Sequence, residues 1–587
     1  MSVNHQKKAE QNIQYRVLLA CVKESLFPDD TRTTIQNGSI KIQRHQHCIH
    51  VEYETRSAFY QFELNGPITY TCGQHSQAIT SLDELMDVLK MHFDIHFHER
   101  LMDELHSSCL GLTLSYEQYA QRQTAIQHSL KFSRMPNTLN FLSWLLHMND
   151  DEHFSGLGYT EGMVWEGHPS HPLTKTKLPL TKDEMKRYAP EFMKIITLRV
   201  VLVHQSFLNE TSMNEESDFV LNRIIPELKT QLHHFMASFD YPLEVYKVMF
   251  VHPWQYENVI VKQFEDEIEK HLVIPTPHTV ESKATLSFRT MALVHKPYHI
   301  KLPVNIQATS AVRTVSTVTT VDGPKLSHQL QDMLEIYPSL KVAAEPYGAY
   351  VDVEKDLARQ FAMIVRYAPS HQIEEDIQIV TAALTQYNPV DHQVTVDSLI
   401  EHIYGEVNSS TIQTFIRHYA ERLITPLIGY IQTYGIALEA HQQNTILQLD
   451  KDTHEFSFIV RDLGGARIDI DTLSQTVPNI EVTNQSLVAD CIEDVIAKFQ
   501  HAVIQNQLGT LIHHFHHKYD VSEEALYQIV KETTERAIRN HLRHADALRE
   551  VLFGHRITVK ALLNMRMQQK VKKYVQIQLD NPLKGEV

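Results

Sequence analysis

A short polar segment, Leu438-Glu439-Ala440-His441-Gln442-Gln443-Asn444, stands directly before two apolar stretches, Thr445 to Leu449 and Phe456 to Val460. Both stretches nearly alternate, and the polar sequence Asp450-Lys451-Asp452-Thr453 between them is typical of a turn. The pattern predicts a β-hairpin. If the hairpin closes with Leu449 near Phe456, its second strand returns Asp462 to the neighbourhood of Asn444.

In that register Glu439, Asn444 and Asp462 converge, with His441 among them. Two carboxylates and an amide oxygen are hard ligands, the set that Mg²⁺ prefers when it also carries phosphate oxygens. The segment therefore predicts one half of a nucleotide site.

A second motif, Glu166-Gly167-His168-Pro169-Ser170-His171-Pro172-Leu173-Thr174-Lys175-Thr176-Lys177, places two imidazoles before prolines. A residue that precedes proline favours extended or polyproline conformation, and three residues per turn would point His168 and His171 to the same side. With Lys175 and Lys177 next to them, the motif suits an anionic ligand. The alternative is a Pro-rich turn with surface histidines. A zinc site is disfavoured, because no third ligand lies at metal-site spacing.

A third block carries basic and hydroxyl side chains: Thr285-Leu286-Ser287-Phe288-Arg289-Thr290, His299-Ile300-Lys301-Leu302-Pro303 and Thr309-Ser310-Ala311-Val312-Arg313-Thr314. We expect strands over Leu286 to Val294 and His299 to Gln307, with Ser287 and Arg289 on one strand face. A turn near His295-Lys296-Pro297 would bring Arg289 opposite roughly Lys301. Two guanidinium groups, an ammonium group and several hydroxyls would then line one sheet and form a cradle for polyphosphate or polycarboxylate. The alternative is a solvated strand face.

The composition limits the class of protein. The chain has 587 residues, a net charge of −17 and 43% hydrophobic residues, which indicates a globular protein of several domains without nucleic acid or anionic membrane as its main partner. Its five cysteines lack a C-x-x-C pair and fit free thiols in a reducing compartment. We expect a cytoplasmic protein without a secretory leader or a membrane span.

Helix and strand patterns do not alternate as βαβ units, so the sequence predicts an α+β fold. Three regions are expected, at 1–160, 161–390 and 391–587. The first mixes both patterns, with a helix from Tyr15 to Leu26. The second carries most of the Pro-marked motifs and a helix from Lys182 to Tyr188. The third is mainly helical, including Ser410 to Tyr434 and Thr558 to Lys573.

The histidine-rich sequences invite a metal interpretation that their pattern does not support. In His513-His514-Phe515-His516-His517, few of the imidazoles share a helix face and carboxylate partners are lacking in the sequence. A surface helix end is the expected structure. The 37 histidines of the chain are dispersed, which disfavours a metal-storage protein.

Taken together, the chain resembles the siderophore synthetases that work independently of non-ribosomal peptide synthetases, such as the aerobactin and achromobactin synthetases. The resemblance runs in order through Glu166 to Lys175, His252-Pro253-Trp254-Gln255, the 285–313 block, Glu439 to Asn444, Val460-Arg461-Asp462-Leu463 and Lys560-Ala561-Leu562-Leu563-Asn564-Met565-Arg566. The family typically has Lys-x-Arg-x-Gly after the paired histidines. Here Lys177 and Pro179 replace the Arg and the Gly, which keeps a positive charge but loses a bidentate donor.

The resemblance implies a cupped-hand architecture: an N-terminal thumb (1–160), a fingers domain with an antiparallel sheet (161–390) and a helical palm (391–587). ATP would lie between fingers and palm. The implied roles are ATP contacts at His168, His171, Lys175, Thr285, Ser287, Arg289, Lys301, Arg313 and His441, Mg²⁺ ligands at Glu439, Asn444 and Asp462, and acid contacts at Thr309, Arg313, His441 and Lys560.

The implied chemistry is carboxylate activation, in which a citrate carboxylate attacks the α-phosphorus of ATP and an amine or hydroxyl then displaces AMP. Arg289, Lys301, Arg313 and His441 would be the catalytic groups, because fixed cations stabilise the crowded negative oxygens. A kinase-like phosphotransferase is the rival, since His441-x-x-Asn444 with Asp462-Leu463-Gly464 is similar to a kinase metal site. The G-x-G-x-x-G loop and V-A-I-K strand of kinases are missing.

The sequence leaves the substrates open. The acid could be citrate, a citryl monoamide or α-ketoglutarate, and the nucleophile a small amine or amino acid. Members of the family are commonly dimers, so a homodimer is expected from the resemblance.

Overall fold

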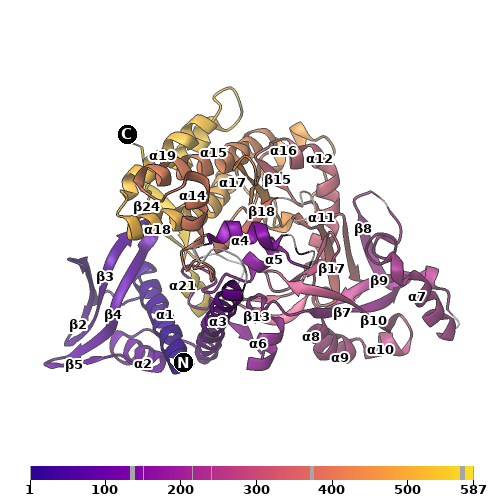
Figure 1. Cartoon of the computed structure of the whole chain (residues 1–587), viewed down its shortest axis with the longest axis horizontal. Coiled ribbons are helices and arrows are strands. Elements are labelled where there is room, and N and C mark those ends of the chain that lie inside the picture. The colour runs from indigo at the N-terminus through magenta and orange to yellow at the C-terminus, as the bar shows by residue number, and fades with distance from the viewer. Residues whose placement is uncertain are drawn as a thin grey trace.

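The structure is a computed structural model that describes residues 2–132, 139–149, 151, 153–214, 216–239, 241–369, 376–568 and 575–585. Figure 1 shows a small sheet with its helices at one end, a large sheet at the other, and a helical mass above the middle. All but one of the strand pairings between named strands are antiparallel, and the helices are not interleaved with them as βαβ units. The predicted α+β class is confirmed.

The N-terminal region is an antiparallel meander packed on helices. Its strands are β1 (Arg32–Gln36), β2 (Ser39–Arg44), β3 (His47–Ser57), β4 (Gln61–Cys72) and β5 (His75–Ala78), and its helices α1 (Ser2–Lys23), α2 (Leu82–Phe93) and α3 (Glu99–Phe132). Ile40, Ile42, Ile49 and Val51 alternate with polar residues and are buried against the helices. The sequence pattern placed the start of this helix at Tyr15, but helix α1 already begins at Ser2.

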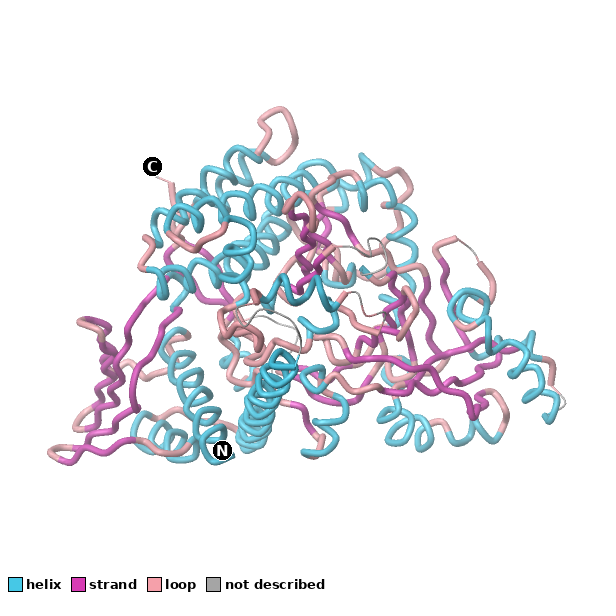
Figure 2. The backbone as a smooth tube through the Cα atoms, in the orientation of Figure 1, coloured by secondary structure: helices cyan, strands magenta, loops and turns pink. Residues whose placement is uncertain are grey.

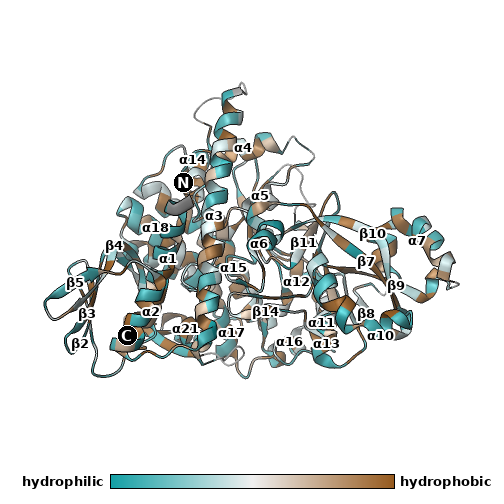
Figure 3. Ribbon diagram, turned by 90° about the horizontal axis from the view of Figure 1, so that it is seen from below, coloured by the Kyte–Doolittle hydropathy of each residue, from teal (hydrophilic) through white to brown (hydrophobic). Residues whose placement is uncertain are grey.

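Helix α3 connects this region to the rest of the chain. Seen from below, it runs between the small sheet and the large one (Figure 3). Its Ser108 hydroxyl donates to Pro172 O and accepts from Lys175 N, and Ser107 accepts from Lys177 N. Hydrogen bonds from α3 therefore fix the backbone of the segment that follows the paired histidines.

The central region is built on an eight-stranded antiparallel sheet. In spatial order its strands are β8 (Leu208–Ser212), β16 (Tyr347–Val351), β17 (Ala362–Tyr367), β12 (Tyr298–Lys301), β11 (Thr290–Leu293), β10 (Val273–Ala284), β7 (Ile196–His204) and β9 (Tyr246–Val251). A separate three-stranded sheet joins β14 (Ala311–Arg313), β13 (Val304–Ala308) and β6 (Lys177–Leu178). The surrounding helices are α4 (Phe141–Met148), α5 (Gly156–Glu161), α6 (Lys182–Tyr188), α7 (Lys229–Met236), α8 (Pro253–Gln255), α9 (Val261–Gln263), α10 (Glu265–Glu269), α11 (Thr317–Gln329), α12 (Gln331–Glu335) and α13 (Lys355–Ala358).

Helices dominate the C-terminal region, as Figure 2 shows in cyan. They are α14 (Thr395–Tyr404), α15 (Ser409–Tyr434), α16 (Ile470–Thr476), α17 (Ile492–Phe499), α18 (Gly509–Tyr519), α19 (Glu523–Ala537), α20 (Ala545–Phe553) and α21 (Leu562–Met567), with a π-helix η12 (Gln500–Leu508) between α17 and α18. The strands are β15 (Leu340–Val342), β18 (Ile377–Val380), β19 (Ile436–Ala437), β20 (Thr445–Leu449), β21 (Phe456–Val460), β22 (Arg467–Ile468), β23 (Arg556–Lys560) and β24 (Gln576–Asp580).

Several predicted elements match and others do not. The helix at Lys182–Tyr188 is confirmed, as is the helix near Ser410–Tyr434. The strand predicted from Leu286 begins only at Thr290, and the one predicted over His299–Gln307 divides into β12 and β13, in two different sheets. The helix predicted from Thr558 was wrong at its start, because Thr558–Lys560 pair with β24, and residues 569–574 of it lie outside the described part. Among the described residues, no helix is long and apolar enough to cross a membrane.

A buried ion pair joins the hairpin to the end of α5. Arg461 Nη1 lies 2.5 Å from Glu161 Oε1, both side chains are 2% exposed, and Arg461 Nη2 also donates to Gln443 O. Glu161 Oε2 accepts from Leu286 N. The pair therefore ties together three segments that flank the candidate site.

Replacing Arg461 by methionine is expected to lower the free energy of unfolding by about 3–5 kcal/mol, because it leaves the Glu161 carboxylate buried and unpaired. Urea denaturation measures the loss. The double variant Glu161→Gln with Arg461→Met should recover part of it, since the buried charge is then gone. A loss of about 1 kcal/mol or less, typical of an exposed pair, would contradict the assignment.

Candidate active site

The hairpin forms in the predicted register. Leu449 pairs with Phe456 and Thr445 with Val460, and Arg461 N donates to Asn444 O beyond the last strand pair. Asp462 follows immediately with φ +77°, a left-handed conformation that Asp adopts more readily than most residues. This turn out of the strand carries the carboxylate toward the large sheet.

Three cations surround Asp462. Lys301 Nζ lies 2.9 and 2.8 Å from its two carboxylate oxygens, Arg366 Nη2 lies 3.9 Å from Oδ1, and Arg289 also acts on its charge. Burial raises the pKa of the Asp462 carboxyl, but the positive charges of Lys301 and Arg366 lower it by more. The pKa of Asp462 is therefore well below its ordinary value. Asp462 is therefore an anion that orders cations from β12 and β17.

A second carboxylate, the buried Glu345, holds the Arg366 side chain in place. Arg366 Nη2 lies 2.8 Å from Glu345 Oε1, and both side chains are almost fully buried. Glu345 N donates to Ser327 Oγ in turn. The large sheet thus supplies a rigid, charged support for Lys301 and Asp462.

Arg289 and Ser287 do not lie on a strand face, as the sequence pattern suggested. Both lie in the turn between β10 and β11, where Phe288 has φ +65°. The Arg289 side chain donates to Thr314 O, and Ser287 Oγ donates to Thr290 Oγ1. In the pairing of β11 with β12, Thr290 lies opposite Lys301, so Arg289 is one residue away from the predicted register.

Arg313 belongs to the separate sheet of β6, β13 and β14, so the prediction that all three cations line one sheet was wrong. Its Nη2 donates to Ala308 O and, at 2.8 Å, to Thr309 Oγ1. Burial and the nearby Arg289 lower the pKa of Arg313 to about 10, while Glu439 opposes them. Arg313 on β14 therefore lies near Arg289 of the β10–β11 turn and near the Glu439 carboxylate.

Glu439 is delivered by β19, which pairs with β22 and sets the carboxylate against Gly465. A Cβ at Gly465 would meet Glu439 Oε2 at 2.0 Å, so only glycine leaves room there. The Lys498 ammonium from α17 contacts Glu439 Oε1, and His441 Nε2 lies 4.0 Å from Oε2. Asn444 Nδ2 donates to Glu439 O at 3.3 Å.

His441 turns its Nε2 toward this cluster. Its Nδ1 accepts from Gln443 N at 3.2 Å, which leaves Nε2 directed at the carboxylate side. Burial lowers the pKa of His441, Glu439 raises it, and Lys498 and Lys560 lower it again. The net shift is downward and favours a neutral imidazole at neutral pH.

Lys560 and His501 lie beside this cluster in the C-terminal region. Lys560 ends β23, where burial and the neighbouring Lys498 lower its pKa to about 8. His501 lies on η12, and burial and Lys560 lower its pKa to about 3. Glu439 and Lys498 both act on His441 and on Lys560, so these four side chains form one electrostatic cluster.

The paired histidines, His168 and His171, lie on a loop next to this cluster. Their ring centroids are 5.9 Å apart, and burial lowers the pKa of both rings. His441 is among the charges that act on His168, and Arg313 is among those that act on His171. His171 Nε2 lies 2.6 Å from Ser310 Oγ, which fixes it to the β13–β14 turn.

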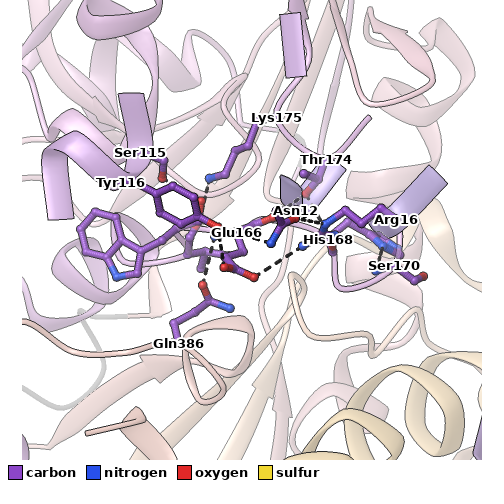
Figure 4. A network of polar contacts seen from close by, with 12 residues as sticks. Asn12, Arg16, Ser115, Tyr116, Glu166, His168, Ser170, Thr174, Lys175 and Gln386 are labelled. Carbon is purple, nitrogen blue, oxygen red and sulfur yellow. Dashed lines mark hydrogen bonds and ion pairs between the residues drawn. The ribbon is translucent and has the colours of Figure 1, made fainter. Parts of the chain in front are cut away.

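Figure 4 shows the network that holds this loop from the N-terminal region. Glu166 Oε1 accepts from the Tyr116 hydroxyl at 2.7 Å, and Arg16 Nη2 lies 3.6 Å from Oε2. Arg16 also donates to His168 O. The loop position therefore depends on α1 and α3 as well as on its own prolines.

Not every predicted residue reaches the cleft. Lys175 points away from it, because its buried ammonium contacts Glu191 and Val164 O, so the predicted ATP contact is corrected to a structural ion pair. Lys177 is buried on β6 and acts on the same Glu191. Thr285 was also predicted to contact ATP. Its Oγ1 is buried and has no hydrogen-bond partner among the described residues.

The helix end expected at His513–His517 is present in α18, but the expectation that it lies on the surface without carboxylate partners was wrong. His513 Nε2 lies 3.1 Å from Glu63 and its Nδ1 lies 2.8 Å from Ser57 Oγ, while His514 contacts Asp397 at 2.8 Å. The carboxylate partners come from distant segments. These histidines bind α18 to the N-terminal sheet and to α14, away from the cluster described above.

Sequence reasoning missed Lys498 and Arg366. Lys498 stands on an ordinary amphipathic helix, and nothing in its spacing marks it. Arg366 does carry a signal, because it is a single charged residue in the apolar strand Ala362–Tyr367.

The oxygen donors suit a hard divalent cation. Glu439, Asn444 and Asp462 offer carboxylate and amide oxygens, the type that Mg²⁺ takes. Lys498 and Lys301 already contact the two carboxylates, and across the described ranges no three His, Cys, Asp or Glu side chains gather as a metal site. The donor types fit Mg²⁺ shared with phosphate oxygens rather than an all-protein cage.

Comparison with known proteins decides the family. The sequence model described as the IucA / IucC family matches residues 158–386. Staphyloferrin A synthase of Staphylococcus aureus (strain NCTC 8325 / PS 47) is 51% identical over 581 residues, 99% of each chain. The chain belongs to the IucA/IucC family of siderophore synthetases. A second model, described as ferric iron reductase FhuF-like transporter, matches residues 413–575.

More distant members extend the likeness. The D-ornithine–citrate ligase of the same S. aureus strain is 28% identical over 73% of this chain and 70% of its own. Among solved structures, the petrobactin biosynthesis protein AsbB from Bacillus anthracis has a TM-score of 0.79 at 19% identity, over 99% and 96% of the two chains. The ATP-bound aerobactin synthetase IucA from Klebsiella pneumoniae has a TM-score of 0.75 at 18% identity, over 98% and 99%. These structures share the fold of this IucA/IucC member.

Proposed function

We propose that the protein is an ATP-dependent ligase that adenylates a carboxylate of citrate, or of a citryl intermediate, and condenses it with a small amine or amino acid. The observation that carries the proposal is the convergence of Arg289, Lys301, Arg313 and His441 on the carboxylates Glu439 and Asp462 in a chain of the IucA/IucC family. The names of two relatives, staphyloferrin A synthase and D-ornithine–citrate ligase, support citrate as the acid and an amino acid as the amine.

In the proposed reaction, a carboxylate oxygen bonds to the α-phosphorus of ATP and the bond to pyrophosphate breaks. Arg289 and Lys301 would hold phosphate oxygens, since both cations are fixed before substrate arrives. Arg313, positioned by Thr309, would orient the carboxylate, and His441 Nε2 would face both reacting groups. The amine then attacks the acyl carbon, loses a proton and displaces AMP.

Lys560 would contact the acid from the palm, and His168 and His171 would line the nucleotide side of the cleft. Glu439, Asn444 and Asp462 would hold Mg²⁺, which when bound supplies positive charge to the departing pyrophosphate. The IucA structure with ATP bound supports nucleotide use in this fold.

The finer architecture is also a proposal. We keep the cupped-hand division into a thumb (1–160), fingers (161–390) and palm (391–587), with ATP between fingers and palm. Three large hydrophobic cores support three packed units, and the largest of them also includes residues from 141–165, 326–343 and 377–384. A homodimer in the cytoplasm is the assembly and location expected for the enzyme.

The test is product analysis with purified protein, ATP, MgCl₂ and a panel of acids and amines. With citrate, AMP and pyrophosphate are expected in equal amounts, and mass spectrometry should detect an amide with one of the amines. α-Ketoglutarate in place of citrate tests the alternative acid. Release of ADP in place of AMP would end the proposal, and ADP together with a phosphorylated acceptor would indicate the rival phosphotransferase.

A further inference from the structure

The rod formed by α17, η12 and α18 changes its hydrogen-bonding pattern beside the His441 segment. Residues Gln500–Leu508 are π-helical, while the flanking helices are α. A π-helix has i→i+5 hydrogen bonds and therefore turns through a smaller angle per residue than an α-helix. Short π-helical stretches inside α-helices are frequently found at functional sites.

Three consecutive amide side chains on this π-helix reach the segments that carry the palm residues of the candidate site. Gln505 Nε2 donates to Thr558 O at 2.8 Å, two residues before Lys560. Asn506 Oδ1 accepts from Gln442 N at 2.8 Å. Gln507 Nε2 donates to Ala440 O and, at 3.0 Å, to Thr445 Oγ1.

Gln505 and Gln507 stand two positions apart on this π-helix and reach different neighbours. Gln505 bonds to β23, and Gln507 bonds to the His441 segment. One short stretch therefore holds both segments.

Gln507 has every polar group of its amide occupied. Its Nε2 makes two contacts with the His441 segment, and its Oε1 accepts from the Tyr419 hydroxyl of α15. The residue is fully buried, and the backbone at Ala440 and Gln442 lies on either side of His441. A shift of this amide would therefore move the imidazole.

We infer that Gln507, supported by Asn506, is a positioning residue for His441. The inference rests on the proposed function only for its catalytic readout. Gln507 touches neither ATP nor acid in this view. It sets the direction of His441 Nε2 and of the neighbouring Glu439.

A matched pair of variants separates this role from stability. Gln432 of α15 is also a buried glutamine with all its groups used, since it donates to Arg539 O and Arg543 O and accepts from Arg539 N. Gln507→Met and Gln432→Met both remove buried hydrogen bonds, so the two variants should lower the urea midpoint of unfolding to a similar degree. Only Gln507→Met should lower kcat for ATP–pyrophosphate exchange, by about 10²-fold, because small displacements of a catalytic group are costly.

Asn506 provides a variant that folds more safely, because its side chain is only half-buried. Asn506→Asp keeps an oxygen acceptor for Gln442 N and should retain more activity than Asn506→Leu, which lacks one. Equal kcat values for these two variants, or equal kcat losses for the Gln507 and Gln432 variants, would overturn the inference.

Hydrogen exchange gives a readout that does not depend on turnover. In the unliganded protein, Gln507→Met should speed amide exchange in the peptide covering 438–449, and Gln432→Met should speed it in the peptide covering 535–545. If the wild-type protein shows no exchange activity with citrate yet this pattern appears, the proposed function fails and the positioning role stands. If exchange in 438–449 is unchanged by Gln507→Met, the positioning role fails.

Discussion

Replacing Arg289 by alanine is expected to lower ATP–pyrophosphate exchange with citrate by about 10²–10³-fold, the loss typical of removing one fixed donor to a developing negative charge. Arg289 is half-buried, its side chain is held by Thr314 O, and it acts on Asp462 together with Lys301 and Arg366. Its charge is therefore aimed before substrate binds. Steady-state exchange rates across ATP concentrations measure the effect.

His441→Ala should give a loss of the same order, because the imidazole faces Glu439 and the proposed acid. His513→Ala is the control. Its contacts with Glu63 and Ser57 belong to the junction between α18 and the N-terminal sheet, so the exchange rate should stay within about twofold while stability falls by about 1 kcal/mol. An equal loss of activity for all three variants would show that the cleft has been misplaced.

Asp462→Asn is expected to lower the rate by at least about 10²-fold and to raise the MgCl₂ concentration needed for half-maximal rate, since even the outer partners of metal ligands are worth 10–100-fold. Asparagine keeps the size of the side chain and tolerates the left-handed backbone at φ +77°, so the hairpin should fold unchanged. The substitution removes the charge that Lys301 and Arg366 share. Rates measured over a range of MgCl₂ concentrations test the metal role.

Asp450→Asn is the matched control at the opposite end of the same hairpin. Asp450 accepts from Asp452 N and Thr453 N in the turn and lies away from the carboxylate cluster. It should change neither the rate nor the MgCl₂ dependence. If Asp462→Asn lowers the rate but leaves the MgCl₂ dependence as in wild type, Asp462 serves as the counter-ion of Lys301 and not as a metal ligand.

The success of the sequence analysis depended on how local each feature was. The hairpin was predictable because a two-strand alternation and a polar turn determine its register within a few residues. The turn that carries Ser287 and Arg289 was not, because Phe288 adopts φ +65°, a conformation that a bulky residue takes only where tertiary packing demands it. The roles of Lys175 and His513 were misjudged for a related reason. Their carboxylate partners, Glu191 and Glu63, are not neighbours in sequence.

By itself the sequence determined the α+β class, the hairpin with Asp462 at its end, and the residue types able to stabilise crowded oxygens. Only the tertiary structure decided which cations meet Asp462, that Arg313 approaches from a separate sheet, and that Lys498, Arg366 and Gln507 belong beside the cleft. The physical reason is that a hydrogen bond or ion pair between distant segments leaves no periodicity in either segment. Local turns and strand alternation do leave one, so they can be recognised before the chain is folded.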